Sequence, residues 1–493
     1  MSKNCSPDLR AAWPSLCQTF KVTAAAATLP LAKLQGLTTN LQTATAEDVV
    51  CYFVREQTAE LLAKSWQVFQ ERLAAARYGL LVLNAWPFKA ALPARAVIFP
   101  ARTHQAFLAV QKAFADIFYP LPGDQHFLGV TGTNGKTTTV HLAVLLASRL
   151  GIKALSVGTL GVRDAEKVLA VPGGTSPSYI EYRKIFYQFA EVKYFFLEIS
   201  SHALDQQRFY DLKLDHAAWP SFSQDHLDYH QTMEAYFVAK LKIISLLLPG
   251  GKLLLPPSQK ALKHKILEHI ASAPVQEADL WPKGEDLPLA LQRGYNADNL
   301  ALAYSWIKLL FKKQWAALDA AALKEIAASL NPPPGRCQWI SQGRQHVIID
   351  YAHTPDALEN IISFLRRDFP EYKLAVIFGA GGNRDRQKRP LMGAVAAAGA
   401  DQVMITSDNP RDEDPATIIT EIKAGIAPDL QHLVQTQVDR RQAINEVLTQ
   451  IKGRPEDWLI LLAGKGHEAE QEIKGHKYHF SDEEVVRDWF KQN

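Results

Sequence analysis

Four apolar runs in the last third of the chain constrain its fold more than any other feature of the sequence. They are VIID (347–350), LAVIFG (374–379), VMITS (403–407) and WLILLAG (458–464), with stretches of helical character between them. Continuous apolar runs that alternate with helices indicate a parallel sheet covered on both faces. Each run ends in a polar cluster, namely DYAHTPD, GAGGNRD, SDNPR or GKGHE. Because doubly wound sheets bind ligands at the carboxyl ends of their strands, these clusters predict a substrate site at that edge.

Two further α/β blocks precede this one. Up to about residue 103, the runs VVCYFV (49–54), LLVLNAW (80–86) and AVIFP (96–100) indicate strands of a small α/β unit. The second block begins with a helix-like segment, Ala106 to Phe118, and ends at the stiff segment NPPPG (331–335), which a helix cannot cross. We therefore predict an α/β protein of three domains. They are a small N-terminal α/β domain (1–103), a central domain with a parallel or mixed sheet (104–336) and a Rossmann-like doubly wound C-terminal domain (337–493).

The segment GVTGTNGKTTT (129–139) predicts a phosphate-binding loop between a strand and a helix. Glycines let the backbone approach phosphate oxygens, and amides at a helix N-terminus donate to them. In such a loop Lys136 reaches the β- and γ-phosphates and the Thr137 hydroxyl binds Mg²⁺. The common spacing requires glycine where Val130 stands, so this is a variant loop with its glycine at Gly132. The loop indicates nucleotide binding, but it does not choose among kinase, motor, switch and ligase.

Charge and composition argue against several kinds of partner. The formal net charge of +3 gives no electrostatic case for nucleic acid. No run approaches the ~18 apolar residues that span a bilayer, and the N-terminus carries no clear export signal. The four cysteines show neither a metal-ligand nor a disulfide pattern, which suits a reducing compartment. We expect a cytoplasmic monomer without nucleic-acid or membrane partners.

Carboxylates and histidines of the second block form a candidate metal site. Glu198 ends the apolar strand YFFLEIS (194–200) at the sheet edge that carries the loop, where a buried carboxylate is costly unless it is paired or metal-bound. The segment DHLDYH follows the next apparent strand and suggests a second hard-cation site, although a solvated loop explains it equally well. Its polar residues are Asp225, His226, Asp228 and His230. Lys240, in the apparent helix Glu234 to Leu247, on its own indicates a surface lysine.

Nine motifs, in order, resemble those of the Mur ligase family, which adds amino acids to the peptidoglycan precursor. They extend from about residue 105 to the end: TGTNGKTT, EISSHALDQQR, SQDHLDYH, GYNADN, PGR, DYAHTPDALE, GAGGNRDRQKRP, SDNPR and GKGHE. They look most like the members that add the third residue. The resemblance implies that the γ-carboxylate of D-glutamate in UDP-MurNAc-L-Ala-D-Glu attacks the γ-phosphate of ATP. The amine of the incoming amino acid then attacks the acyl phosphate, a reaction that depends mainly on positioning and charge neutralisation.

The resemblance also implies roles for individual residues. It assigns ATP binding to Gly132, Thr133, Asn134, Gly135, Lys136, Thr137, Thr138, Asn296, Asn299, Arg336 and Asp350, with His353 nearby. It assigns UDP-MurNAc-dipeptide binding to Thr175, Ser176, Ser200, Gln206 and Arg208. The implied Mg²⁺-site residues are Thr137, Glu198, His226 and Lys240, and the implied catalytic residues are Lys136, His226 and Lys240. Lys240 matches a carbamylated lysine of the family, and because carbamylation requires the neutral amine, its pKa of about 10.4 must be lowered by its site.

The motif DNPR (408–411) implies which amino acid is added. In the family an arginine here accompanies meso-diaminopimelate, whose second carboxylate a guanidinium can bind in bidentate fashion. The implied amino-acid contacts are Arg384, Asp408, Asn409, Arg411, Gly464 and Glu468. Alternatively, Arg411 is a loop cation beside Asp412 and Glu413, and the added amino acid is lysine.

Some positions depart from the family pattern. Ala380 and Asn383 stand where Cys and Asp are frequent, which puts the hydrogen bonds beside Arg384 in doubt. Pro220-Ser221 replaces Thr-Asn, and Glu470 replaces a common tyrosine. The N-terminal block matches least, and Thr38-Thr39-Asn40 is its nearest candidate for a uridine contact. We assign UDP binding to this block by its place in the architecture.

Three other functions stay open at this stage. A folylpolyglutamate synthetase-like ligase shares the loop and the chemistry, although DNPR and GKGHE argue against it. A phosphate-loop hydrolase or switch would leave the four strand-end clusters without a purpose. A non-catalytic UDP-sugar binder would not need Lys136, Glu198 and Lys240.

Overall fold

A computed structural model describes residues 8–22, 29, 31–53, 69–85, 92–93, 95–282 and 287–493, without the side chains of residues 32, 228 and 289. The described residues separate into two compact units. The first contains the chain up to Lys136 together with Gly151–Leu255 and Gln259–Glu277. The second contains Thr137–Leu150, Pro256–Ser258 and Ala278–Asn493. Of the helices described, none combines the length and apolar character needed to cross a bilayer.

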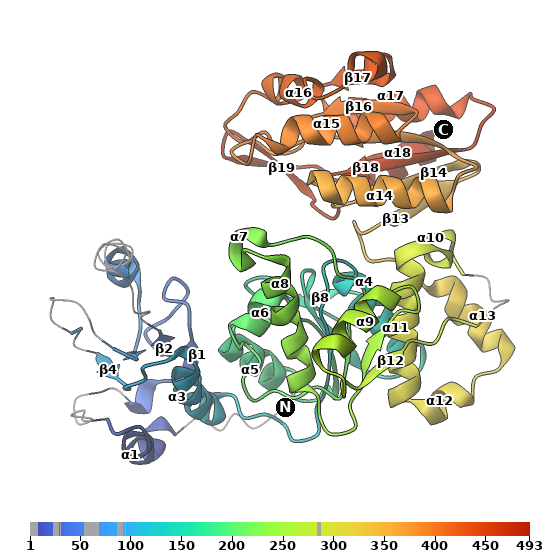
Figure 1. Ribbon diagram of the computed structural model, residues 1–493. Coiled ribbons are helices and arrows are strands. Elements are labelled where there is room, and N and C mark those ends of the chain that lie inside the picture. The colour runs from blue at the N-terminus through green and yellow to red at the C-terminus, as the bar shows by residue number, and fades with distance from the viewer. Residues whose placement is uncertain are drawn as a thin grey trace. The chain divides into compact units, whose positions relative to one another are not determined.

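The N-terminal block of the first unit is a small parallel sheet with helices (Figure 1). Its described elements are α1 (Leu9–Phe20), the 3₁₀ helix η2 (Leu31–Lys33), β1 (Gly36–Thr38), β2 (Asp48–Tyr52), β3 (Leu80–Leu83) and β4 (Ala96–Ile98). The strands lie in the order β1-β2-β3-β4, and each neighbouring pair is parallel. The expected α/β unit is therefore confirmed. Its strands end at Tyr52 and Leu83, and residues 54 and 86 of the expected runs lie outside the described part of the chain.

A mixed sheet forms the centre of the first unit. Its strands are β5 (His126–Val130), β6 (Ala154–Gly158), β7 (Gly161–Arg163), β8 (Val168–Ala170), β9 (Tyr194–Glu198), β10 (His216–Ala218), β11 (Leu253–Leu255) and β12 (Val275–Glu277). They lie in the order β12-β11-β10-β5-β9-β6-β7-β8, parallel except where β7 pairs with β6 and β8. Strand β5, which leads into the phosphate loop, is thus an interior strand between β10 and β9.

Helices connect these strands and continue into the second unit. They are α3 (His104–Phe118), α4 (Lys136–Arg149), α5 (Tyr179–Gln188), α6 (Ser201–Asp205), α7 (Leu227–His230), α8 (Met233–Leu241), the 3₁₀ helix η3 (Lys242–Leu246) and α9 (Lys260–His269). Next come α10 (Leu289–Gln292), α11 (Gly294–Leu310), α12 (Lys312–Ala316) and α13 (Ala320–Ser329). The helix expected over 234–247 is therefore wrong at its end: α8 stops at Leu241 and a 3₁₀ turn follows.

The C-terminal block contains the doubly wound sheet that the four apolar runs predict. Its strands are β13 (Gln338–Gln342), β14 (Gln345–Asp350), β15 (Lys373–Phe378), β16 (Gln402–Thr406), β17 (Val434–Gln437) and β18 (Trp458–Ala463), in the order β13-β14-β18-β15-β16-β17. The four runs are β14, β15, β16 and β18, which pair in parallel. Two edge strands were not expected, and one of them, β13, is antiparallel to β14.

Helices cover both faces of this sheet (Figure 1). They are α14 (Pro355–Asp368), α15 (Lys388–Gly399), α16 (Pro415–Lys423), the 3₁₀ helix η4 (Pro428–Leu433), α17 (Arg440–Lys452) and α18 (Asp482–Gln492). Val376 packs with residues of α14, α15 and α16, whereas its neighbours Ala375 and Ile377 pack with α17 and α18. Alternate residues of a strand point to opposite faces, so each strand is buried on both sides. A hairpin of β19 (Glu470–Ile473) and β20 (His476–His479) follows β18.

Candidate active site

The phosphate-binding loop lies between β5 and α4, as the sequence predicts. Gly132 and Gly135 have φ angles of 146° and 90°, which glycine adopts at low cost. The Lys136 ammonium donates to the carbonyl oxygens of Gly132 at 2.8 Å and Thr133 at 2.9 Å. Lys136 therefore folds back over its own loop. Thr137 and Thr138 follow in the first turn of α4, and Asn134 N–H donates to Ser221 Oγ at 2.9 Å.

Lys240 is buried, so its interpretation as a surface lysine was wrong. It lies on α8 with only 1% of its surface exposed. Its Nζ donates at 2.8 Å to the carbonyl oxygen of Gly132, the atom that Lys136 also contacts. Burial, followed by the positive charge of Lys136, lowers the pKa of Lys240 well below its usual value. The site thus favours the neutral amine that carbamylation requires.

Tyr236 connects Lys240 to the loop, although the sequence did not single it out. Its ring centroid lies 4.6 Å from Lys240 Nζ, and its hydroxyl lies 3.3 Å from Thr133 Oγ1. The two residues are one turn apart on α8, which places them on the same face of the helix. The sequence therefore indicates that Tyr236 and Lys240 share a helix face, but only the fold shows that this face lies against the phosphate loop.

Glu198 is buried at the end of β9, with 1% of its surface exposed. Thr159 binds both of its carboxylate oxygens: the backbone N–H donates to Oε1 at 2.9 Å and the hydroxyl to Oε2 at 3.1 Å. Thr159 directly follows β6, the strand beside β9, but nothing in the sequence singled it out. Two hydrogen bonds from one residue fix the orientation of the carboxylate.

The five residues assigned to the dipeptide form a connected group around Glu198. Ser176 Oγ donates to the Glu198 carbonyl at 2.9 Å and accepts from Ser200 N–H at 2.9 Å. The Arg208 guanidinium donates to the Ser176 carbonyl and to Gln206 Oε1, the latter at 2.8 Å from Nη2. Thr175 Oγ1 lies 3.1 Å from Thr159 Oγ1, which completes the link to the Glu198 carboxylate.

A cavity of about 850 Å³ adjoins this group within the first unit. Gln206 and Arg208 line it together with Ser178, Glu181 and other residues of the central sheet region. The N-terminal block contributes Thr38, Thr39 and Asn40, the segment that the sequence suggested for uridine. Thr39 Oγ1 donates to Ser178 Oγ at 3.3 Å across the cavity wall.

The segment DHLDYH follows β10, and its two histidines pack against other side chains of the first unit. His226 adopts a left-handed backbone conformation with φ 52°, and its ring lies 4.9 Å from the His202 ring and 6.0 Å from the Tyr236 ring. His230 is buried against Ser201 Oγ at 2.9 Å, and burial lowers its pKa. No cluster of three or more His, Cys, Asp or Glu side chains suited to a metal ion occurs among the described residues. The second hard-cation site expected in DHLDYH therefore stays a prediction.

The remaining ATP residues lie in the second unit. Asn296 and Asn299 are buried on α11, and Thr139 of α4 donates to Asn299 Oδ1 at 3.4 Å. Asp350 ends β14, where its carboxylate accepts from the N–H groups of Cys337 at 2.7 Å and Ala352 at 2.9 Å. Burial raises the pKa of Asp350, and the nearby Arg336 opposes this shift.

Arg336 itself packs against an aromatic ring. Its guanidinium lies 4.9 Å from the centroid of Tyr351, and His353 Nδ1 lies 2.7 Å from the Tyr351 carbonyl oxygen. The motifs PGR and DYAHTPD thus meet at one place, as their common assignment to ATP implies.

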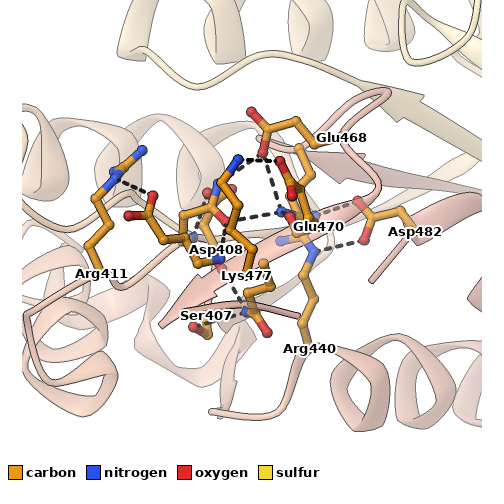
Figure 2. Close-up of polar contacts among 12 residues, drawn as sticks. Ser407, Asp408, Arg411, Arg440, Glu468, Glu470, Lys477 and Asp482 are labelled. Carbon is orange, nitrogen blue, oxygen red and sulfur yellow. Dashed lines mark hydrogen bonds and ion pairs between the residues drawn. The ribbon is translucent and has the colours of Figure 1, made fainter. Parts of the chain in front are cut away.

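The six residues assigned to the amino acid lie at the carboxyl ends of β15, β16 and β18. Figure 2 labels Asp408, Arg411 and Glu468 among them. Asn409 Nδ2 donates to Glu468 Oε2 at 2.8 Å. A Cβ on Gly464, which has φ 111°, would lie 2.5 Å from Asp408 Oδ2, so only glycine fits there. A Cβ on Gly381 would lie 3.0 Å from Arg411 Nη1 and 3.7 Å from Arg384 Cγ, so the two arginines flank Gly381.

Arg411 contacts the β19–β20 hairpin rather than its sequence neighbours. Its Nε donates to Glu472 Oε2 at 3.1 Å, and its Nη1 donates to the Gly382 carbonyl at 2.8 Å. Its backbone N–H and carbonyl pair with the hairpin at Glu472 and Lys474. The alternative described Arg411 as a loop cation beside Asp412 and Glu413. It is wrong about the partners of Arg411, because the guanidinium contacts Glu472 and Gly382 instead.

Two segments of the chain match families of known proteins. Residues 130–281 match the Mur ligase middle domain, and residues 335–466 match the Mur ligase glutamate ligase domain. The UDP-N-acetylmuramoyl-L-alanyl-D-glutamate–2,6-diaminopimelate ligase of Aquifex aeolicus is 38% identical over 393 residues, which cover 75% of this chain and 79% of the relative. The chain belongs to the Mur ligase family. It is accordingly an ATP-dependent ligase that joins an acid to an amino acid.

Two further relatives of this Mur ligase carry the same printed name. The ligase of Rickettsia rickettsii is 36% identical over 403 residues, which cover 76% of this chain and 82% of the relative. A solved structure of a UDP-N-acetylmuramoyl-L-alanyl-D-glutamate–2,6-diaminopimelate ligase is 28% identical, with a TM-score of 0.58 and coverage of 93% of this chain and 95% of that one. The three-domain α/β fold predicted from the sequence is thereby confirmed, while the domain boundaries stay a prediction.

Residues that differ from the common family pattern make specific contacts in this Mur ligase. Asn383 has φ 52°, a conformation that asparagine tolerates, and its Nδ2 donates to Asp412 Oδ2 at 2.6 Å. An aspartate there would place two carboxylates together. Ser221 Oγ accepts from Asn134 N–H, so Pro220-Ser221 supports the phosphate loop. Glu470 pairs across the hairpin with Lys477 at 2.7 Å.

Proposed function

We propose that this chain joins meso-2,6-diaminopimelate to the D-glutamate of UDP-MurNAc-L-Ala-D-Glu, with ATP converted to ADP and phosphate. The observation that carries the proposal is the buried Lys240, which shares the Gly132 carbonyl with Lys136. A simple nucleotide switch has no need for a second lysine whose pKa is lowered beside the loop. A ligase that uses a carbamate does need one.

Lys240 acts by a change of charge. Its neutral amine adds to CO₂ and releases one proton, which converts the uncharged side chain into a carbamate anion. The carbamate, the Glu198 carboxylate and the Thr137 hydroxyl are hard oxygen donors, the kind that Mg²⁺ prefers. Bound there, Mg²⁺ would neutralise charge on the transferring phosphoryl group. The orientation that Thr159 gives Glu198 suits this role.

The acyl phosphate forms at the loop. An oxygen of the D-glutamate γ-carboxylate bonds to the γ-phosphorus of ATP, the bond to the β-phosphate oxygen breaks, and ADP leaves. Lys136 exchanges the carbonyl oxygens of Gly132 and Thr133 for phosphate oxygens when nucleotide binds. The amine of diaminopimelate then bonds to the acyl carbon, inorganic phosphate leaves, and the amine gives up a proton. Positioning supplies most of the rate in such a reaction.

The cavity of the first unit suits the nucleotide sugar. Its volume of about 850 Å³ is in the range of sites for large ligands. Thr38, Thr39 and Asn40 offer hydroxyl and amide groups for the uridine end, and Arg208 offers a cation near the peptide end. The link from Arg208 through Ser176 to the Glu198 carbonyl suits a dipeptide that extends from this cavity toward the phosphate loop.

The amino-acid end suits diaminopimelate better than lysine. Arg411 and Arg384 flank Gly381 and offer cations for a second carboxylate. Asp408 and Glu468 offer anions for the distal ammonium group, and Asn409 stands between them. Lysine has no second carboxylate, so the guanidinium groups would gain nothing from it.

Phosphate release from ATP tests the proposal directly. The full chain is given UDP-MurNAc-L-Ala-D-Glu, and meso-diaminopimelate or L-lysine is added in separate reactions. We expect release that depends on diaminopimelate and is much weaker with lysine. Release that needs no amino acid would refute the ligase reaction, and a preference for lysine would refute the role of Arg411.

We further propose that the protein works as a monomer in the cytoplasm. The described cysteines, Cys17, Cys51 and Cys337, are free thiols, which suits a reducing compartment. Light scattering on the purified chain tests the monomer, and fractionation of the producing cell tests the location. A stable dimer, or recovery outside the cytoplasmic fraction, would contradict the respective claim.

A further inference from the structure

Lys465 is a buried cation in the amino-acid site to which the motifs assign no role. It follows Gly464 and is 0% exposed. Its ammonium donates to the Glu470 carbonyl at 2.7 Å, to Asn409 Oδ1 at 3.3 Å and to Glu468 Oε2 at 3.3 Å. An ammonium has three donors, and here each has an acceptor. Lys465 thus joins the DNPR loop, its own turn and the start of the β19–β20 hairpin.

These bonds fix which way the Asn409 amide points. Its Oδ1 accepts from Lys465 Nζ and, at 3.0 Å, from the backbone N–H of Glu472. Both partners can only donate, so the oxygen must face them. The amide nitrogen is thereby directed to Glu468 Oε2 at 2.8 Å. Asn409 is held as part of a network rather than left to adapt to a ligand.

The charge of Lys465 also balances the carboxylates of the site. Asp408 and Glu468 lie close enough to raise the pKa of Arg440, but that guanidinium is already engaged by Asp482 (Figure 2). Arg411 is engaged by Glu472. Among the ion pairs of the described residues, the cation in contact with Glu468 is Lys465, at 3.3 Å. Without it, Glu468 and Asp408 would repel each other in a partly desolvated site.

We propose that Lys465 is a positioning residue for the incoming amino acid: it sets the orientation of the Asn409 amide and the Glu468 carboxylate. The inference rests on the proposed function and adds a determinant of amino-acid affinity to it. The three hydrogen bonds of the Lys465 ammonium go to Asn409, Glu468 and Glu470, none of which is assigned to ATP, so its effect should be confined to the second half of the reaction.

The test replaces Lys465 with methionine, which keeps the length of the side chain and removes the charge. We expect KM for meso-diaminopimelate to rise about 10- to 100-fold, because hydrogen bonds to charged groups contribute about 1.5–3 kcal/mol each. KM for ATP should stay within about twofold. Formation of the acyl phosphate without amino acid, followed as the ADP burst in a quenched-flow experiment, should keep its full amplitude.

Lys477→Met is the matched control. Lys477 lies on the same hairpin and pairs with the Glu470 side chain, but both partners are exposed. Exposed pairs contribute little, so KM for diaminopimelate should not change. If the methionine variant does not fold, Lys465→Gln, which keeps a polar head group, tests the role of Lys465 instead. We again expect KM for meso-diaminopimelate to rise at least about tenfold.

Two results would overturn the inference. One is an unchanged KM for diaminopimelate in a folded Lys465 variant. The other is a loss of the ADP burst in parallel with the amino-acid step, since a merely structural role would weaken both. Failure of the proposed function looks different: the unmodified chain would then show no phosphate release that depends on diaminopimelate.

Discussion

The ion pair of Arg440 and Asp482 gives a sharp test of how the C-terminal domain is held together. Both side chains are 0% exposed, at the first residues of α17 and α18. Arg440 Nε donates to Asp482 Oδ1 at 2.8 Å and Nη2 donates to Oδ2 at 2.7 Å, while Nη2 also reaches the Ala463 carbonyl at 3.1 Å. The pair therefore fixes the end of β18, from which the GKGHE motif begins.

Asp482→Asn keeps the shape of the side chain and removes its charge, which leaves a buried guanidinium without a counterion. Two hydrogen bonds to charged groups, at about 1.5–3 kcal/mol each, predict a loss of about 3–6 kcal/mol. Broken buried pairs typically cost about 3–5 kcal/mol, which agrees. For a domain of about 150 residues, each kcal/mol lowers Tm by about 2–4 °C, so a loss of about 3–5 kcal/mol should lower the Tm of the C-terminal transition by about 6–20 °C.

Calorimetry of the full chain measures this transition, and hydrogen exchange of β18 assigns it to the C-terminal domain. Arg487→Met is the control, because Arg487 pairs with Glu483 on the exposed side of the same helix, and less than about 1 kcal/mol should be lost. The double variant Arg440→Met with Asp482→Leu should recover most of the stability. A shift of under about 3 °C for Asp482→Asn, or a double variant no better than the single one, would refute the reasoning.

Three other predictions concern the site. Lys240→Met should lower kcat about 10²- to 10³-fold. The pKa of Lys240 is lower in the folded protein than in the unfolded chain, so between the folded pKa and about 10.5 the unfolded chain binds more protons. The stability of the protein should therefore rise with pH over this range. Thermal melts of Lys240→Met at several pH values should show a smaller rise. Thr159→Val frees one oxygen of Glu198 and should reduce kcat, whereas Thr159→Ser should not; equal rates for both would count against the role of the hydroxyl. Arg389 of α15 pairs with Glu413 at 2.8 Å and lowers the pKa of that carboxylate to about 2. Glu413→Gln should therefore lower stability above about pH 4.5, and the difference should disappear as pH falls toward 2. A difference that does not change with pH in acid unfolding would contradict this.

Much of the fold follows from local sequence patterns. The strands β14, β15, β16 and β18 were predictable because a strand buried on both faces is a continuous apolar run. Strand β17, with the sequence VQTQ, lies at the sheet edge and is only partly buried, so it lacks this signal. Strand β13 is likewise partly exposed, and no periodicity indicates its antiparallel direction.

The candidate site was predictable where a motif carries its own geometry. The loop residues lie where the strand, the glycines and the helix require them. Contacts between distant segments were not predictable, since no local pattern encodes them: Thr159 meets Glu198 because β6 lies beside β9. The burial of Lys240 has the same cause, for the helix MEAYFVAKL gives no sign that its lysine faces the loop.

The strand order of the central sheet has a consequence for how the protein is made. Strand β5 gains its two neighbours, β9 and β10, only after Glu198 and Ala218 have left the ribosome. Until then, the apolar segment HFLGV has two unpaired edges, the kind of surface on which chains aggregate. The nucleotide loop can thus become rigid only after residues 1–218 of the 493-residue chain have been made. Pauses in translation before Ala218 should expose nascent chains to chaperones, whereas later pauses should not.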